Sequence, residues 1–325
     1  MSRIVFWIAA VLTLLLAVLS GALVGAVPVS VADVASLLGG EAGDPVAATI
    51  LREVRLPRVA RAALVGGMLS MAGAVFQVLL RNPLADPYIL GVSGGAAVGA
   101  IAVVMIGAGA GWTMAGGSLA GALFTVAVVF LLAGAWRGAG GDRLLLTGVV
   151  LASFWGALVA LFLSVSQNEQ LRSVLFWLMG DLGQTGALAG TASAFAVGLA
   201  GATALGRSMD ALTYGDRHAM GLGVAVRPVR GGLYIAGSLM TAAAVSAAGT
   251  IGFVGLIVPH AVRLFGVRSH RELIPASAVV GAAFLVLADT AGRTIVSPIE
   301  LPVGVVTAFI GAPFFLWLLR REKKS

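Results

Sequence analysis

The sequence contains no cysteine and few charged side chains, and both absences limit what the protein can be. Without cysteine it has no disulfide bonds and no thiolate metal sites. Lys, Arg, Asp and Glu account for only 11% of the 325 residues. The only lysines are Lys323 and Lys324, so the sequence lacks the Gly-x-x-x-x-Gly-Lys loop that cradles phosphate in many ATPases. We therefore expect that any ATP hydrolysis linked to this protein occurs on another polypeptide.

Catalytic and metal-binding patterns are also missing. No Ser-His-Asp or paired-carboxylate arrangement is visible, and His218, His260 and His270 share no metal-ligand spacing. We expect no intrinsic catalysis and no metal or cofactor bound by this chain. The net charge of +7 is dispersed except at the tail, which argues against nucleic acid as a partner.

Apolar residues are abundant, at 59% of the sequence with a mean hydropathy of +1.02, whereas soluble domains are about 45 to 50% apolar. They form about ten stretches, most of them long enough for a helix to cross a hydrocarbon core, which takes about 20 residues. Continuous apolar runs fit helices rather than the alternating strands of a membrane barrel. We predict an all-α polytopic membrane protein with about ten transmembrane helices, near residues 4–26, 59–80, 88–106, 114–136, 144–166, 187–205, 231–249, 251–266, 273–291 and 302–319.

One transmembrane domain is expected to fill residues 1–325, because the polar segments 27–58 (outer) and 206–230 (cytoplasmic) are too short for a separate soluble domain. If the N-terminus is cytoplasmic, 15 of the 21 Lys and Arg residues fall in inner gaps and 6 in outer gaps. This bias follows the positive-inside rule and predicts that both termini are cytoplasmic. The first apolar run exceeds the roughly 7 to 15 residues of a signal-peptide core, so we interpret it as a retained helix.

The outer cations concentrate in residues 51–58 (LREVRLPR) and at Arg61 just beyond. Pro57 is expected to end any preceding helix and to lie in the first turn of the next. Arg55 and Arg58 would then flank the entry into the second span. An acidic partner, lipid phosphates or an ion pair with Glu53 could each explain these cations.

Residues 81–95 (RNPLADPYILGVSGG) form an inner loop with two prolines and a glycine-rich end, which predicts a rigid, non-helical turn. Irregular backbone at membrane depth persists only where protein or a water-filled cavity covers it. We therefore expect this loop to line a pathway.

Together with residues 249–260 (GTIGFVGLIVPH) and 300–304 (ELPVG), this loop resembles the permeases of the vitamin B12, haem and ferric-siderophore class of ABC importers. The resemblance covers about residues 50–320 in unbroken order. It implies a homodimer with a central pathway in a bacterial or archaeal cytoplasmic (inner) membrane. It also implies two cytoplasmic ATPase subunits, which bind ATP and Mg, and an outer solute-binding protein that delivers the cargo. That cargo would be a metal chelate, namely a ferric siderophore, haem or cobalamin.

The same resemblance implies three functional sites. Arg55, Arg58 and Arg293 match positions that meet glutamates of the binding protein. Residues 212–224 (LTYGDRHAMGLGV) match a short pair of helices that couples to the ATPase, with candidate residues Tyr214, Gly215, Asp216, Arg217, Ala219, Leu222 and Gly223; Arg217 and His218 depart from the acidic and small residues usual there. A cytoplasmic gate would comprise Asn82, Pro83 and Leu84 together with Gly141 and Asp142, which replace small hydroxyl residues, although Asp142 could instead cap a helix.

An ion-gradient-driven secondary transporter is the alternative function. It would need charged or polar residues in several spans, and only Asp289 with a few Ser and Thr is available. Asp289 and Arg293 are four residues apart, which favours an intrahelical ion pair over a proton relay. Separately, the pairs Gly95 with Gly99 and Gly117 with Gly121 predict close helix packing.

Overall fold

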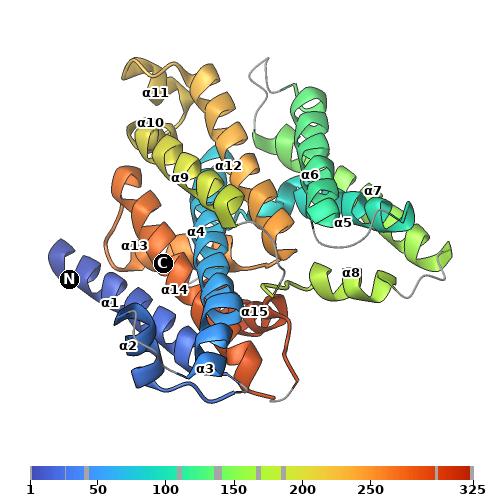
Figure 1. Ribbon diagram of the computed structural model, residues 1–325. Helices are drawn as coiled ribbons and strands as arrows, with labels where there is room; N and C mark the ends of the chain where they lie inside the picture. Colours follow the sequence, from blue (N-terminus) through green and yellow to red (C-terminus); the bar gives the residue numbers. More distant parts are fainter. Residues whose placement is uncertain are drawn as a thin grey trace.

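The computed structural model describes residues 2–25, 27–39, 44–107, 112–134, 141–165, 170–183, 188–296 and 299–322. These residues form helices and loops with no β-strand among them (Figure 1), which confirms the all-helical prediction. The longer helices are α1 (Arg3–Leu23), α4 (Leu56–Leu79), α5 (Val92–Met105), α6 (Trp112–Leu132), α7 (Gly141–Val165), α9 (Leu188–Ala204), α12 (Val226–Ala248), α13 (Val254–Leu264), α14 (His270–Thr294) and α15 (Val303–Glu322). The shorter elements are α2 (Val31–Gly39), α3 (Pro45–Thr49), the π-helix η1 (Ile50–Arg55), the 3-10 helix η2 (Pro87–Leu90), α8 (Gln170–Leu178), α10 (Gly206–Thr213) and α11 (Asp216–Gly221).

Among the described residues, six helices are long and apolar enough to cross a membrane, namely α1, the continuous helix Pro45–Leu79, α6, α7, α12 and α14. Each of the other four predicted stretches also contains a helix. Of these, α9 continues into α10 through a bend of 54°, and α5, α13 and α15 contribute shorter apolar helices of 10–17 residues. The chain is thus multi-pass by length and composition of its helices, and the count of ten spans stays a prediction.

Two boundaries differ from the sequence-based prediction. Pro57 does not end a helix, because η1 runs directly into α4 and Pro57 lies in the first turn of α4. A π-helical turn is wider than an α-helical one, so it leaves room for a proline ring that would clash with the carbonyl four residues earlier. The stretch predicted to start at residue 251 begins as a loop, and α13 starts only at Val254, after the left-handed backbone of Phe253.

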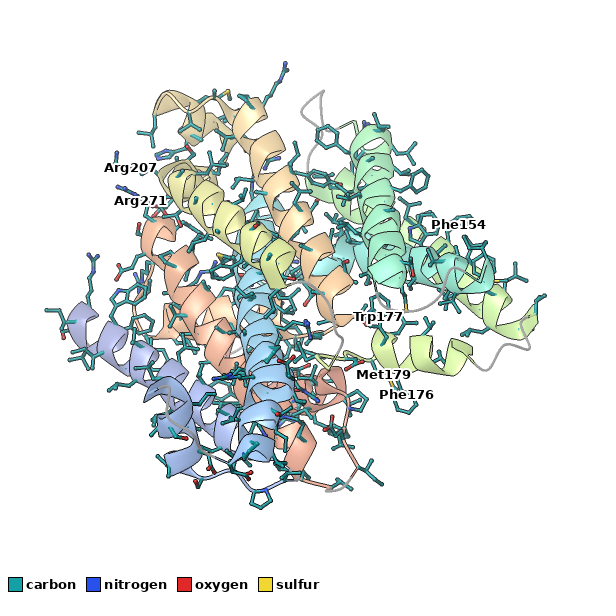
Figure 2. The ribbon with its side chains drawn as sticks, in the orientation of Figure 1. Phe154, Phe176, Trp177, Met179, Arg207 and Arg271 are labelled. Atoms are coloured by element: carbon teal, nitrogen blue, oxygen red, sulfur yellow. The ribbon has the colours of Figure 1, made fainter. Side chains whose placement is uncertain are left out.

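Helix α4 forms the centre of the bundle (Figure 1) and packs against α9, α12, α13 and α14. In its most apolar 18-residue window 89% of the residues are buried, whereas the corresponding figure for α7 is 17%. A helix that is apolar on all sides is expected in the interior, as α4 is. The outer helices instead expose apolar side chains, which are available to contact lipid or another protein. Figure 2 shows Phe154 of α7 and Phe176 of α8 on the outside of the molecule.

Glycine permits a close helix contact between α5 and α6. A Cβ atom added at Gly99 would lie 2.1 Å from the carbonyl oxygen of Gly117, and one added at Gly121 would lie 2.1 Å from that of Gly95. The two predicted glycine pairs therefore pack against each other, which confirms the prediction. Since lipid supplies no hydrophobic force between helices, such close backbone contact is a main source of their association.

Gly117 and its neighbour Gly116 test this packing. A Cβ atom at Gly117 would approach Val103 Cγ2 to 2.4 Å, whereas a Cβ atom at Gly116 would meet nothing within 4 Å. We expect Gly117→Ala to destabilise the protein by about 1–3 kcal/mol through overpacking and to lower the unfolding temperature of the detergent-solubilised protein. Gly116→Ala is the control and should be neutral or slightly stabilising, because alanine favours helix. Equal shifts for the two variants would contradict the packing argument.

Candidate functional site

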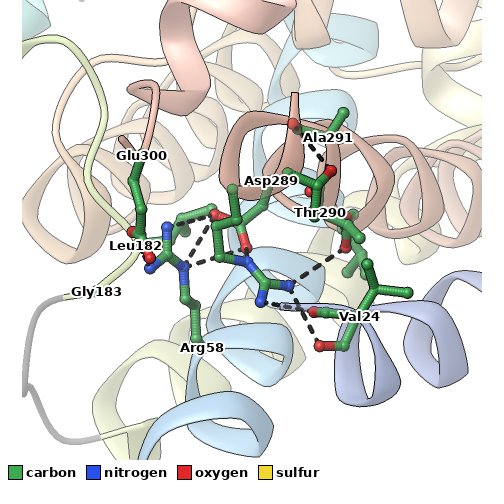
Figure 3. Close-up of polar contacts among 12 residues, drawn as sticks. Val24, Arg58, Leu182, Gly183, Asp289, Thr290, Ala291 and Glu300 are labelled. Atoms are coloured by element: carbon green, nitrogen blue, oxygen red, sulfur yellow. Dashed lines mark hydrogen bonds and ion pairs between the residues drawn. The ribbon is translucent and has the colours of Figure 1, made fainter. Parts of the chain in front are cut away.

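An outer charge cluster, defined as Arg55, Arg58, Asp289, Arg293 and Glu300, lies where α1, α4 and α14 come together (Figure 3). Asp289 is 2% exposed and lies between two arginines. Its carboxylate oxygens are 3.0 Å from Arg58 Nη2 and 3.1 Å from Arg293 Nε. The predicted intrahelical pair of Asp289 and Arg293 is confirmed. The pairing with Arg58 was not predicted, because the two residues are 231 positions apart and no local spacing indicates it.

Arg55 and Arg293 also bind the C-terminal end of α1. Arg55 Nη1 donates to the carbonyl oxygens of Ala22 and Leu23, each at 2.8 Å, and Arg293 donates to those of Gly21 and Val24 at 3.2 and 3.1 Å. The last carbonyls of a helix have no partner within the helix, so the two arginines act as a side-chain cap.

The three predicted docking arginines are thus brought together, but two of them are turned inward. Arg55 and Arg293 are 4% and 7% exposed. The guanidinium of Arg58 reaches further outward, because its Nη1 donates to Glu300 at 2.7 Å and the side chain of Glu300 is 55% exposed. The docking role of all three stays a prediction.

Three loops meet in a second site, the three-loop junction, which comprises residues 178–183, 249–253 and 301–304. The backbone N–H of Asp181 donates to Ala248 O at 2.9 Å, and the N–H groups of Val303 and Gly304 donate to Gly180 O and Met179 O, each at 3.1 Å. Thr250 Oγ1 also donates to Leu178 O, so residues 178–183 connect both later segments that carry the family resemblance.

Glycine is required at one point of this junction. Gly249 has a φ of 71°, and a Cβ atom there would lie 1.8 Å from the carbonyl oxygen of Trp177. Arg61 contributes from α4, where its buried side chain donates to Leu182 O at 2.8 Å. Non-helical backbone inside a membrane protein needs such partners, and here the protein itself supplies them.

The gate turn, residues 81–91, is attached to this junction. Asn82 Oδ1 accepts from the N–H of Leu84 at 2.9 Å, which fixes a tight turn at Pro83, and the Tyr88 hydroxyl accepts from the N–H of Ile251 at 3.1 Å. Asp86 Oδ1 accepts from the N–H of Tyr88 at 2.9 Å. Burial raises the pKa of Asp86 to about 6, and its hydrogen bonds from the backbone N–H groups of Tyr88 and Phe253 partly oppose that shift.

Backbone strain occurs at two residues linked to the gate turn. Arg81 has a φ of 47° and Phe253 has a φ of 69°, and these are the only non-glycine residues with positive φ in the part of the chain described. Left-handed backbone costs a residue with a side chain about 1–2 kcal/mol. Such strain persists only where surrounding contacts hold it, and it is concentrated at functional sites.

The second predicted gate position lies at the start of α7. Asp142 is exposed in the first turn of that helix, and residues 135–140 before it lie outside the described ranges. Helix α7 packs closely on the end of the gate turn, since a Cβ atom at Gly148 would be 2.5 Å from Ile89 O. The gate role of Gly141 and Asp142 stays a prediction.

The coupling pair, α10 and α11, is the predicted pair of short helices, and it lies at the opposite end of the bundle from α2 and α3 (Figure 1). Gly215, with a φ of 103°, joins the two helices, and Gly223, with a φ of 80°, follows α11. Ala219 is buried, Arg217 is exposed, and Tyr214, Met220 and Leu222 are 78%, 56% and 64% exposed. Exposed apolar side chains on a compact knob indicate a contact surface for another protein.

Asp216 joins the coupling pair to the gate turn. Its Oδ1 lies 2.7 Å from Nη2 of Arg81, the first residue of the gate turn, and 3.3 Å from Nη2 of Arg230 on α12. A movement of the coupling pair would therefore pull directly on the gate turn. This contact was not predicted, because the two residues are 135 positions apart and no local spacing indicates it.

The chain is similar to known transport proteins along most of its length. The model of the FecCD transport family matches residues 12–321. The ABC transporter permease protein YvrB of Bacillus subtilis is 43% identical over 88% of this chain and 84% of its own length. The cobalamin import permease BtuC of Halobacterium salinarum is 44% identical over 86% of this chain and 76% of its own length. The hemin transport permease HmuU of Yersinia pestis is 38% identical over 84% of this chain and 83% of its own length.

Two solved structures are also similar to this chain. A metal-chelate type ABC transporter in an inward-facing conformation has a TM-score of 0.85 at 30% identity, covering 98% of this chain and 100% of that chain. PsaBC from Streptococcus pneumoniae has a TM-score of 0.57 at 18% identity over 87% and 94% of the two chains, which shows a shared fold alone.

The outer charge cluster can be tested by two carboxylate substitutions. Asp289→Asn would leave the guanidiniums of Arg58 and Arg293 without the buried carboxylate between them, and breaking such a pair costs about 3–5 kcal/mol. We expect a large fall in the unfolding temperature of the detergent-solubilised protein. Glu300→Gln is the matched control, because exposed ion pairs contribute only about 0–1 kcal/mol. Comparable effects of the two substitutions would contradict the central role of Asp289.

Proposed function

Because the chain belongs to the FecCD transport family, we propose that it is the membrane subunit of an ABC importer that moves a metal chelate, namely a ferric siderophore, haem or cobalamin, into the cytoplasm. The similarity to import permeases over more than four fifths of the chain is the observation that carries this proposal. The family is one of transport permeases, so the subunit does no chemistry of its own, and a partner ATPase binds and hydrolyses ATP.

The proposed topology has ten spans in one domain of residues 1–325, with both termini cytoplasmic, in a bacterial or archaeal inner membrane. The six long helices and the four shorter or bent ones support this count. The charge bias supports the orientation. The placement of α2 and α3 at one end of the bundle and of the coupling pair at the other is consistent with an outer and a cytoplasmic end (Figure 1).

We propose that two copies enclose the pathway between them and that the gate turn closes it at the cytoplasmic end, through Asn82, Pro83 and Leu84 together with the start of α7. The apolar side chains exposed on α7, such as Val150 at 67% and Phe154 at 53%, are available to contact the second copy or lipid. The tight attachment of the gate turn to the three-loop junction supports a gate with defined positions rather than a loose loop.

We propose that the coupling pair fits a groove on the ATPase, with Tyr214, Met220 and Leu222 as apolar contacts. When two ATPase subunits bind ATP and close together, they would displace the coupling pair as a unit. The ion pairs of Asp216 would then transmit this movement to Arg81 and α12.

Leu222 and Leu132 provide a matched test of coupling, because their exposed fractions are 64% and 70% and both lie toward the proposed cytoplasmic side. We expect Leu222→Ala to reduce ATP-driven uptake by the reconstituted complex about tenfold or more, since a central apolar contact is worth about 2 kcal/mol. Leu132→Ala should leave uptake unchanged. Uptake that collapses with the proton gradient and ignores ATP would instead identify a secondary transporter.

Docking of the binding protein is tested at Arg58. Arg58→Gln should slow association of the binding protein by up to about fivefold, as expected for a charge at the edge of an interface, and the unfolding temperature of the variant separates this effect from loss of the buried pair with Asp289. Arg52→Gln removes an exposed cation six positions away and should have little effect. Glu300→Gln keeps the buried pair and frees Arg58, so it should accelerate association. If association is unchanged in both Arg58→Gln and Glu300→Gln, Arg58 has no docking role.

A further inference from the structure

A basic pocket of about 560 Å³ lies between the gate turn, α10, the end of α13 and the start of α14. Pro83 of the gate turn and Tyr214 of the coupling pair contribute to its lining, but the proposed transport role assigns no ligand to it. Its lining includes the cations Arg81, Arg263 and Arg268, and its walls also include Asp210 and His270. Any ligand bound there would touch both the gate turn and the coupling pair.

The one carboxylate in the lining does not neutralise the arginines. Asp210 is already occupied by its neighbours. Its carboxylate accepts hydrogen bonds from the backbone N–H of His270 at 2.8 Å and from the hydroxyl of Ser269 at 3.2 Å. Its Oδ1 also lies 2.6 Å from Nδ1 of the His270 ring. Arg263 binds the neutral amide of Gln77.

Two of the three arginines therefore keep their charge available. Within the described ranges neither Arg263 nor Arg268 forms an ion pair. His270 is 5% exposed, and its Nε2 has no hydrogen-bond partner in the described part of the chain. The pocket thus combines uncompensated positive charge with a buried ring nitrogen that has no partner within the described residues.

The same wall of the pocket borders an apolar surface at the edge of the bundle. Leu264 and Phe265 follow Arg263 directly and are 60% and 56% exposed. The centre of the Phe265 ring lies 6.1 Å from that of the Phe6 ring on α1. Helix α1 is itself largely exposed, since only 22% of the residues in its most apolar 18-residue segment are buried. Cations beside an exposed apolar surface at a helix end are what an anionic lipid requires, because its phosphate and its acyl chains must both be accommodated.

We propose that the basic pocket binds the phosphate of an anionic phospholipid, with Arg263 and Arg268 as its main charge partners and the acyl chains against Leu264 and Phe265. A free phosphate ion shares the charge chemistry but has no use for the apolar surface. The bound lipid would tie the gate turn, through Arg81, to the start of α14. The proposal relies on the cytoplasmic placement of this end, but its test measures lipid binding and does not require transport.

The test is a lipid titration of the full-length permease in mild detergent, followed by native mass spectrometry. Phosphatidylglycerol, phosphatidylcholine and inorganic phosphate are the probes. We expect phosphatidylglycerol to bind more tightly than phosphatidylcholine, and excess inorganic phosphate not to displace it. Arg268→Gln should weaken phosphatidylglycerol binding about fivefold, since each cation near an anionic lipid contributes about 1 kcal/mol.

Arg227→Gln is the matched control, because Arg227 is an exposed cation at the same end of the bundle that does not line the pocket. It should bind phosphatidylglycerol like the unmodified protein, and the unfolding temperatures of both variants report whether they fold. Equal weakening in the two variants, or no preference for phosphatidylglycerol, overturns the proposal. Displacement by inorganic phosphate assigns the pocket to a free anion, and displacement by the ATPase subunit assigns it to that interface; either result overturns the lipid assignment.

Discussion

The fold depends on one constraint, that every backbone N–H and C=O group removed from water must find a partner within the protein. Helices satisfy this requirement along their length but not at their ends. The molecule uses buried arginines for these ends. Arg55 and Arg293 bind the last carbonyls of α1, and Arg61 binds a carbonyl of the three-loop junction. A guanidinium has five donors and no acceptor, so it suits clusters of carbonyl oxygens.

Burying these arginines is unfavourable in free energy unless each positive charge is paired. Asp289 provides this pairing for Arg293 and also for Arg58, because its two oxygens face these two arginines. The outer charge cluster is therefore both a structural cap and a set of charges near the surface. Glycine solves the complementary problem of helix contact, and α4 can lie at the centre because its own glycines let α13 and α14 come close. A Cβ atom at Gly73 would be 1.9 Å from Gly255 O, and one at Gly66 would be 2.3 Å from Gly281 O.

Features with a local signal were predictable from the sequence. Apolar runs gave the helices, the four-residue spacing gave the pair of Asp289 with Arg293, and glycine spacing gave close helix packing at Gly95, Gly99, Gly117 and Gly121. The pairing of Arg58 with Asp289 and of Arg81 with Asp216 joins residues more than 130 positions apart, so no periodicity reveals it. The π-helix before Pro57 and the late start of α13 were missed for another reason. Composition shows that a segment is apolar, but not where its backbone leaves the α-helical conformation.

The backbone strain at Arg81 and Phe253 affects which conformations of the gate turn are favoured. Both residues lie at helix ends, one after α4 and one before α13, and each is restrained by a carboxylate: Asp216 pairs with Arg81, and Asp86 accepts from Phe253. When either restraint loosens, the residue can relax toward ordinary backbone angles, which lowers the free energy of the rearranged turn by about 1–2 kcal/mol. The backbone strain at Arg81 and Phe253 therefore favours any rearrangement that breaks these two restraints.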